Sequence, residues 1–253
     1  MPRLALAHRM HSDAHTPPAD GPRPFIGPNE VEQFVTRVLD AREALPGEQI
    51  AALMSRGATV ESIYCDLLAP AARRLGEMWE DDSCDFLQVT VALGRLQQTL
   101  RDLSESTGRS PVRSETTRSV LITGLPDEQH TLGLLIVAEC FVRDGWTVNV
   151  GHPLIENSLV DTVRDDWYDV VGFSLALPER VMELRGMINR LRRASRNPHV
   201  VVLVGGKAFL DDQSLVSTVG ADDGIGDARD AARVARVVLA ERGIAMTGEA
   251  REA

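Results

Sequence analysis

The chain of 253 residues is 43% hydrophobic and 25% charged, and its formal net charge at pH 7 is −10. This is the composition of an ordinary globular protein, with enough residues for one large domain or two small ones. The excess of acidic side chains argues against unspecific binding to nucleic acid or to an anionic membrane surface.

The cysteines and the apolar runs indicate the compartment. Cys65, Cys84 and Cys140 are widely spaced and odd in number, so the sequence indicates neither a disulfide framework nor a zinc motif. The first ten residues, MPRLALAHRM, contain too short an apolar run for the core of a signal peptide. No run approaches the roughly 18 apolar residues of a membrane span. We expect a cytoplasmic protein without a membrane contact.

The first third of the chain predicts a disordered arm followed by helices. Residues 1–28 hold six of the 13 prolines and show no apolar period, which is typical of a disordered arm. A helical period then begins and predicts an antiparallel bundle over 29–106. Its four helices are expected at 29–45, 47–57, 59–82 and 85–105.

Particular residues predict how these helices begin and end. Asn29 and Thr59 are candidate N-caps, and Gly57 is a candidate C-terminal glycine. Pro70 is expected to kink or break the third helix. The fourth helix should bury one apolar stripe, formed by Phe86, Val89, Leu93, Leu96 and Leu100.

Residues 107–118 are polar and without period and predict a linker. From 119 to 243 continuous apolar segments alternate with helical ones, which predicts a doubly wound parallel sheet covered by helices on both faces. Residues 244–253 form a tail. The strands are expected at 120–125, 146–151, 169–176, 199–206 and 221–226.

Glu128, His130 and Gly133 lie where the first strand passes into its helix. Ligands bind beyond the carboxyl ends of the strands in such sheets. A histidine here can ligate a metal, and a carboxylate two residues earlier can fix its tautomer. By spacing alone, an ordinary structural turn is the better explanation of the triplet, and both interpretations stay open at this point.

Small residues are expected at the ends of three other strands. Gly172 and Ser174 are assigned to the third strand end, Gly205 and Gly206 to the fourth, and Ala221 to the fifth. Together they would form a slot on the sheet. Each glycine taken singly is also explained by a tight turn.

The pattern E-x-H-x-x-G, then serine, then G-G resembles the cobalamin-binding Rossmann-like (flavodoxin-like) fold, whose usual motif is D-x-H-x-x-G…S-x-L…G-G. The resemblance implies that His130 is the lower ligand of cobalt and that the nucleotide base lies beside the serine and the glycines. LGEMWEDD resembles the cap segment of that family, which implies that Trp79 lies over the upper face of the corrin.

Four positions depart from the family pattern. Glu128 replaces the usual aspartate, and Ala176 stands in the third position of S-x-L. Val89 and Thr90 occupy the positions where light-sensing repressors of the family carry Glu-His after the cap tryptophan. An upper-face histidine ligand of that kind is therefore missing.

WEDDSCDFLQVTVALGRLQ resembles the AerR/PpaA group of photosynthesis-gene antirepressors. This resemblance implies a light- or redox-responsive regulator that binds adenosylcobalamin or hydroxocobalamin. It would act through a DNA-binding repressor of the PpsR/CrtJ type, without specific DNA contacts of its own. No catalytic constellation is present, and we expect no turnover. The alternatives are a corrinoid carrier of a methyltransferase, a heme-binding sensor, and a response-regulator-like domain without a cofactor.

Overall fold

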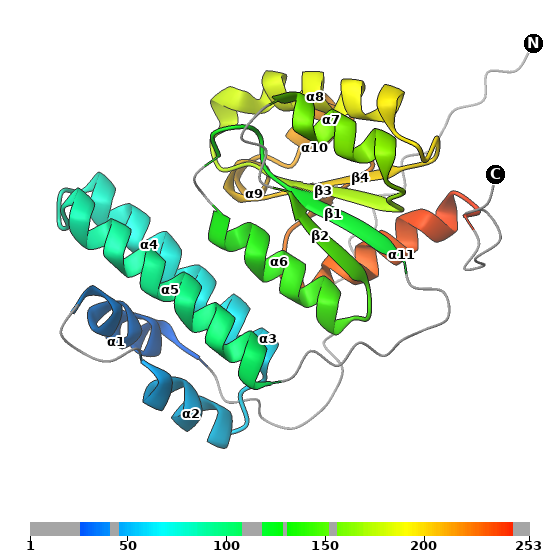
Figure 1. The fold of residues 1–253 in the computed structure, drawn as a ribbon. Helices are drawn as coiled ribbons and strands as arrows, with labels where there is room; N and C mark the ends of the chain where they lie inside the picture. Colours follow the sequence, from blue (N-terminus) through cyan, green and yellow to red (C-terminus); the bar gives the residue numbers. More distant parts are fainter. Residues whose placement is uncertain (1–25, 41–45, 108–117, 129–130, 152–155, 245–253) are drawn as a thin grey trace, which may run out of the picture.

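The computed structural model of the chain describes residues 26–40, 46–107, 118–128, 131–151 and 156–244. Most of the expected arm, the tail after residue 244, most of the linker and the end of the first expected helix lie outside these ranges, whereas Pro28, expected in the arm, already belongs to a helix. The described chain forms an N-terminal helical part and a C-terminal α/β part (Figure 1). This confirms the predicted fold class.

The N-terminal part consists of helices that bury a common apolar core. Phe34, Val38, Leu67, Leu75 and Leu96 are fully buried in it. Its elements are α1 (Pro28–Leu39), α2 (Gly47–Ser55), α3 (Val60–Ser62), the π-helical η1 (Ile63–Leu68), α4 (Ala69–Glu80) and α5 (Phe86–Ser106).

Of the two predicted N-caps, one is confirmed and the other is wrong. Thr59 caps α3 as predicted, since its side chain accepts a hydrogen bond from the Ser62 amide. The prediction of Asn29 as N-cap was wrong. Gly27 holds that position, and its amide donates to the Glu30 carboxylate at 3.1 Å. Pro28 explains the earlier start, because its fixed φ suits the first helical position.

The expected break at Pro70 does not occur. The chain stays helical from Val60 to Glu80, and a π-helical segment, η1, comes directly before the proline's helix. Ala69 donates to the Tyr64 carbonyl, five residues earlier. A π-turn changes the hydrogen-bond register, so that the helix accommodates a residue that has no amide hydrogen.

The α/β part contains a five-stranded parallel sheet in the order β2-β1-β3-β4-β5. This order places the switch in winding direction between β1 and β3, where ligands of open α/β sheets bind. The strands are β1 (Ser119–Thr123), β2 (Thr147–Gly151), β3 (Val170–Ser174), β4 (Val201–Gly205) and β5 (Asp223–Ile225).

Helices cover both faces of the sheet (Figure 1). One face packs against α6 (Thr131–Arg143) and α11 (Ala231–Glu241). The other face packs against α7 (Glu156–Asp165), α8 (Val181–Ala194), α9 (Lys207–Asp211) and α10 (Leu215–Val219). Short helical turns, η2 (Pro178–Arg180) and η3 (Ala228–Asp230), precede α8 and α11.

Helix α6 joins the two parts, because it lies between α5 and the sheet (Figure 1). Leu132 and Ile136 belong to the core of the helical part, whereas Leu134 and Phe141 belong to the core under the sheet. A buried hydrogen bond of 2.8 Å from the Ser104 hydroxyl of α5 to the Glu139 carboxylate of α6 adds to this contact. The N-terminal part is therefore packed firmly on one side of α6.

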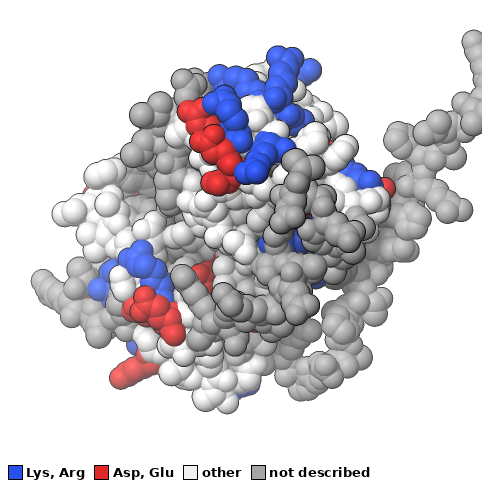
Figure 2. Space-filling view, turned by 45° about the vertical axis from the view of Figure 1, so that its right-hand side comes forward, with Lys and Arg blue, Asp and Glu red and all other residues white. Residues whose placement is uncertain are grey.

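The molecular surface carries charges of both signs. On the face drawn in Figure 2, basic side chains gather beside acidic ones rather than forming one uniformly basic face. None of the helices in the described ranges is long and apolar enough to cross a membrane.

Candidate functional site

The loop that follows β1 has a tightly defined conformation up to Glu128. The Glu128 amide donates to the Leu125 carbonyl at 3.1 Å, which closes a turn. Asp127 takes a φ of 62°, in the left-handed region. A Cβ on Gly124 would stand 3.0 Å from Glu128 Cβ and Cγ, so glycine leaves room for the glutamate to fold back over the loop.

His130, the predicted cobalt ligand, lies outside the described residues together with Gln129. The chain is described again from Thr131, whose hydroxyl accepts a hydrogen bond of 3.0 Å from Gln97 of α5. Of the residues on either side of this pair, Glu128 is placed by the turn after β1, and Thr131 is placed by the contact of α6 with α5.

Gly133 lies in the first turn of α6 and is exposed, with open space where a side chain would stand. A glycine is therefore not required here by the packing of the described chain. This leaves the approach of a bulky ligand as the reason that the family pattern would give for it.

Three of the predicted slot residues share one face of the sheet. Gly172 and Ser174 alternate with Phe173 along β3, and Ser174 pairs with Gly205 of β4. They belong to the face covered by α6 and α11, since Gly172 also pairs with Ile122, whose side chain lies in that core. A Cβ on Gly172 would stand 2.9 Å from Ile122 Cδ1. Ser174 and Gly205 thus leave small side chains at the carboxyl edge, as predicted.

Gly206 has a structural reason of its own. Its φ is +99°, and a Cβ there would stand 2.5 Å from the Leu175 carbonyl oxygen. Leu175 donates to the Gly205 carbonyl, and Ala208 donates to the Leu175 carbonyl. The end of β3 and the turn after β4 therefore approach each other along their backbones, and only glycine fits between them.

Ala221 was expected at the end of the fifth strand, and this placement was wrong. It precedes β5, and the next residue, Asp222, donates its amide to Val202 near the start of β4. Ala221 thus lies toward the amino edge, opposite the other slot residues. The physical reason is Gly220, whose left-handed conformation ends α10 and delays the strand. Gly226 takes the place after β5.

Trp79, the predicted cap residue, is exposed, with 48% of its surface accessible. Phe86 is 70% exposed, and its ring lies edge-on to Trp79 with centroids 5.9 Å apart. The expectation that Phe86 belongs to the buried stripe was therefore wrong. Leu87 and Val91 are also exposed. We call these four residues the apolar tip; it lies at the turn between α4 and α5 and the first turns of α5.

The apolar tip lies at the same end of the molecule as the carboxyl edge of the sheet (Figure 1). Lys207, which follows β4, connects the two regions electrostatically. Its pKa is raised by Asp211 and, to a smaller extent, by Glu80 at the end of α4. The end of α4 is therefore close enough to the connection after β4 to act on it. Leu177 and Leu210, in the connections after β3 and β4, are likewise exposed. Exposed apolar groups of this kind are candidates for contact with an apolar ligand or partner.

No group of three or more metal-ligating side chains occurs within the described ranges. A self-contained metal site is thus not built there. A corrin needs no such group, since it brings most of the metal's ligands itself. The apolar tip and the small residues at the sheet edge would suit a large, largely apolar cofactor, and His130 is the metal ligand that the sequence predicts.

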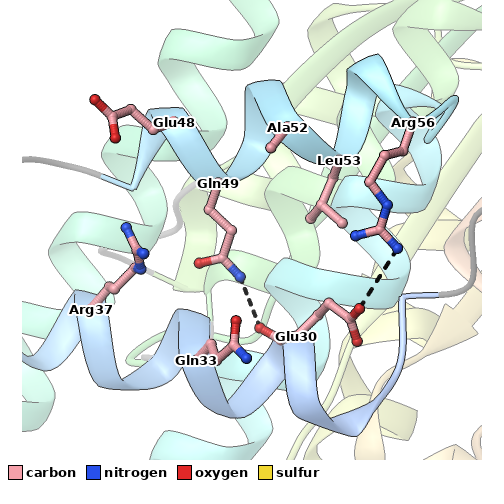
Figure 3. Close-up of a pocket in the computed structure, with 8 residues that line it drawn as sticks. All are labelled: Glu30, Gln33, Arg37, Glu48, Gln49, Ala52, Leu53 and Arg56. Atoms are coloured by element: carbon pink, nitrogen blue, oxygen red, sulfur yellow. Dashed lines mark hydrogen bonds and ion pairs between the residues drawn. The ribbon is translucent and has the colours of Figure 1, made fainter.

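A hollow lies between α1 and α2 (Figure 3). Gln49 donates to the Glu30 carbonyl at 3.0 Å, and Arg56 approaches the Glu30 carboxylate at 3.9 Å. The hollow is open and lined mainly by charged and amide side chains that already interact with each other. It is not connected with the sheet edge and carries no chemistry of its own.

Comparison with known proteins identifies the class. Residues 118–236, which contain the whole sheet, match the family model described as B12 binding domain. The α/β part of the chain is therefore similar to the B12-binding domain family, and the match supports a cobalamin-type cofactor. The slot residues and the β1–α6 loop all fall within the matched range.

Two individual proteins are similar over most of the chain. A Rhodobacter capsulatus protein, described as an uncharacterized 20.5 kDa protein in the bchF-crtJ intergenic region, is 28% identical over 163 residues, which is 64% of this chain and 84% of that protein. The structure of the monomethylamine corrinoid protein of Methanosarcina barkeri is similar with a TM-score of 0.68 at 14% identity, covering 83% of this chain and 98% of the other. The latter likeness shows that the helical part and the α/β part share a common fold with that protein.

Proposed function

We propose that this protein is a cobalamin-binding regulator of transcription, which responds to light or redox state and relieves the action of a repressor of photosynthesis genes. The observation that carries the proposal is the exposed apolar tip beside the carboxyl edge of a B12-binding domain. The similarity to a protein encoded between bchF and crtJ supports the link to photosynthesis genes.

The residues have distinct roles in this proposal. His130 would hold the cobalt of the cofactor, and Glu128 would orient its imidazole. Ser174 and Gly205 leave room for the nucleotide base of the cofactor, and Gly172 continues this surface along β3. When bound, cobalamin supplies a cobalt centre whose upper ligand can be exchanged or lost in light.

The apolar tip would read the state of the upper face. Trp79 and Phe86 would be covered by a cofactor bound at the sheet edge, and the exposure of their rings would depend on the state of that cofactor. Ser104 of α5 is hydrogen-bonded to α6, which packs on the sheet. A movement of the apolar tip, at the other end of α5, would therefore be transmitted to the packing of the helical part against the sheet. A partner that binds one packing better than the other then shifts the equilibrium between them.

The partner is proposed to be a DNA-binding repressor of the PpsR/CrtJ type. The net charge of −10 and the mixed charges in Figure 2 favour regulation through a protein rather than by direct contact with DNA. The arrangement supports a sensor without turnover. A corrinoid carrier would use the same cofactor site but would present cobalt to a methyltransferase, and a heme sensor would show a different absorption spectrum.

The regulatory part of the proposal is tested with a purified PpsR/CrtJ-type repressor and its promoter DNA. The dissociation constant of the repressor–DNA complex is measured with the cofactor-free chain and with the hydroxocobalamin-loaded chain, in the dark and in light. We expect a change that requires the loaded chain. An identical dissociation constant in every state would contradict the antirepressor role and favour a carrier.

A further inference from the structure

Arg180 connects the β1–α6 loop to the neighbouring strand connection. It is the last residue of η2, which follows β3 and leads into α8. One of its guanidinium nitrogens, Nη2, donates to the Pro126 carbonyl at 2.7 Å. Because β1 and β3 are adjacent, this hydrogen bond crosses the switch point of the sheet, where the cofactor is proposed to bind.

The guanidinium is held in one orientation by Glu183. Arg180 Nε and Nη2 donate to the two carboxylate oxygens of Glu183 at 2.9 and 2.7 Å. The arginine side chain is 22% exposed, which leaves it less screened than an open surface pair. This two-point contact leaves the guanidinium aimed at the loop, an arrangement that suits the planar fork of arginine and not a lysine ammonium.

The loop needs such a contact because its own conformation is costly. Asp127, which has a side chain, sits in the left-handed region with a φ of 62°. Such positions are strained and persist where surrounding contacts enforce them. Pro126, whose carbonyl accepts the hydrogen bond from Arg180, is the residue directly before Asp127.

The charges agree with the geometry. Glu183 most strongly, and then Glu128 and Asp127, raise the pKa of Arg180 above its ordinary value. The cation therefore lies within electrostatic range of both carboxylates of the loop, in addition to its own partner on α8. Its position favours a loop that stays close to the start of α8.

We infer that Arg180 is a positioning residue for the cofactor site, which holds residues 124–128 in the conformation that a bound cobalamin requires. The part of the inference that concerns the loop stands on the hydrogen bonds alone. The part that concerns cobalamin rests on the proposed function. Arg180 lies outside the E-x-H-x-x-G, serine and G-G positions.

The variants separate positioning from charge and from general stability. Arg180→Gln removes the guanidinium group together with its charge. Arg180→Lys keeps the charge, but a lysine ammonium cannot contact both carboxylate oxygens of Glu183 and the Pro126 carbonyl at once. Arg192→Gln is the matched control, since Arg192 lies in α8, the helix that follows Arg180, but contacts Asp222 and the Gly220 carbonyl at the far end of that helix.

Two measurements on the full chain test the inference. Amide hydrogen exchange of residues 124–128 is followed in the cofactor-free protein, where we expect exchange about tenfold faster in both Arg180 variants and unchanged in Arg192→Gln. The dissociation constant of hydroxocobalamin should rise by about 10- to 100-fold in the Arg180 variants, the range typical of residues that orient a metal ligand.

The outcomes are distinguishable. Unchanged loop exchange in both Arg180 variants, or faster exchange with unchanged affinity for hydroxocobalamin, would overturn the inference. If the unsubstituted protein does not bind hydroxocobalamin, the proposed function fails, and the exchange rates still decide whether Arg180 holds the loop. A change in the unfolding midpoint alone, equal in Arg180→Gln and Arg192→Gln, would show that Arg180 acts on stability only and would also overturn it.

Discussion

Trp79 and Phe86 pack edge to face across the turn between α4 and α5, yet both rings remain largely exposed. Two aromatic side chains that pack on each other and not on the core contribute little to folding. Their apolar surface is available to a ligand or partner, which is why they are central to the proposed site.

Replacing Trp79 by alanine should therefore affect binding more than folding. We expect a loss of at most about 1–1.5 kcal/mol in the free energy of unfolding, which is the range of one aromatic pair. The affinity for hydroxocobalamin should fall clearly. The contrasting variant is Leu96→Ala, at a fully buried position of the same helix pair, which should cost about 2–5 kcal/mol. Urea unfolding gives both values, and a Trp79 variant as unstable as Leu96→Ala would refute an exposed tip.

Replacement by alanine should have opposite effects on the stability of the protein at two glycines of the expected motif, Gly206 and Gly133. Gly206→Ala should destabilise the protein by about 1–3 kcal/mol, because its φ is +99° and its Cβ would meet the Leu175 carbonyl. Gly133→Ala should leave the unfolding midpoint unchanged or raise it, since alanine favours a helix and the space is open. It should nevertheless weaken cobalamin binding. Equal unfolding midpoints for both variants would contradict this division.

Tyr64 should make the stability of the protein fall at alkaline pH. Burial most strongly, and then the Glu139 carboxylate, raises the pKa of Tyr64 to about 12 from the model-compound value of 10.0. Since the neutral phenol is favoured in the folded state, this stabilisation is complete below pH 10 and is lost as the pH rises toward 12.

The matched variant is Tyr64→Phe, which removes the titrating group. The Tyr64 hydroxyl makes no well-formed hydrogen bond within the described residues, although the Arg143 guanidinium lies 5.9 Å from its ring, so we expect little loss of stability at neutral pH. Unfolding free energies measured between pH 8 and 11 should diverge for the two proteins above about pH 10. Parallel curves over this range would argue against a buried, titrating Tyr64.

The hydrogen bond between Ser104 and Glu139 should stabilise the contact of the two parts of the chain. Ser104→Ala removes a donor from a buried carboxylate, and we expect a cost of about 1–3 kcal/mol. Ser106→Ala, two residues further along α5 and exposed, should stay within about 0.5 kcal/mol of the unsubstituted protein. Denaturant unfolding compares the two, and no difference between them would count against a firm α5–α6 contact.

The layered architecture could be predicted from the sequence because its signal is periodic. Continuous apolar segments gave the parallel sheet, and the helical period gave the helices before it. The period identifies which face of a helix is apolar but not how far a neighbouring helix extends. Phe86 follows the period of α5 and still lies exposed, because it is the first residue of that helix, at the apolar tip.

Local exceptions depend on backbone contacts that a single sequence does not display. Pro70 predicts a break, but the π-turn before it keeps the chain helical. Ala221 was assigned to the wrong sheet edge because Gly220 delays β5. Arg180 carries no recognisable motif, and only the folded chain places it at Pro126. Of the predicted site, Ser174 and Gly205 are brought together, whereas His130 lies outside the described residues.

The most direct test of the cobalamin site is an absorption spectrum of the purified protein mixed in the dark with adenosylcobalamin or hydroxocobalamin and then illuminated. It is recorded for the unsubstituted protein and for His130→Ala. We predict a bound corrin spectrum that changes on illumination and is altered or lost when His130 is replaced. No corrin binding, or a heme Soret band in its place, would contradict the assignment of cobalamin as the cofactor.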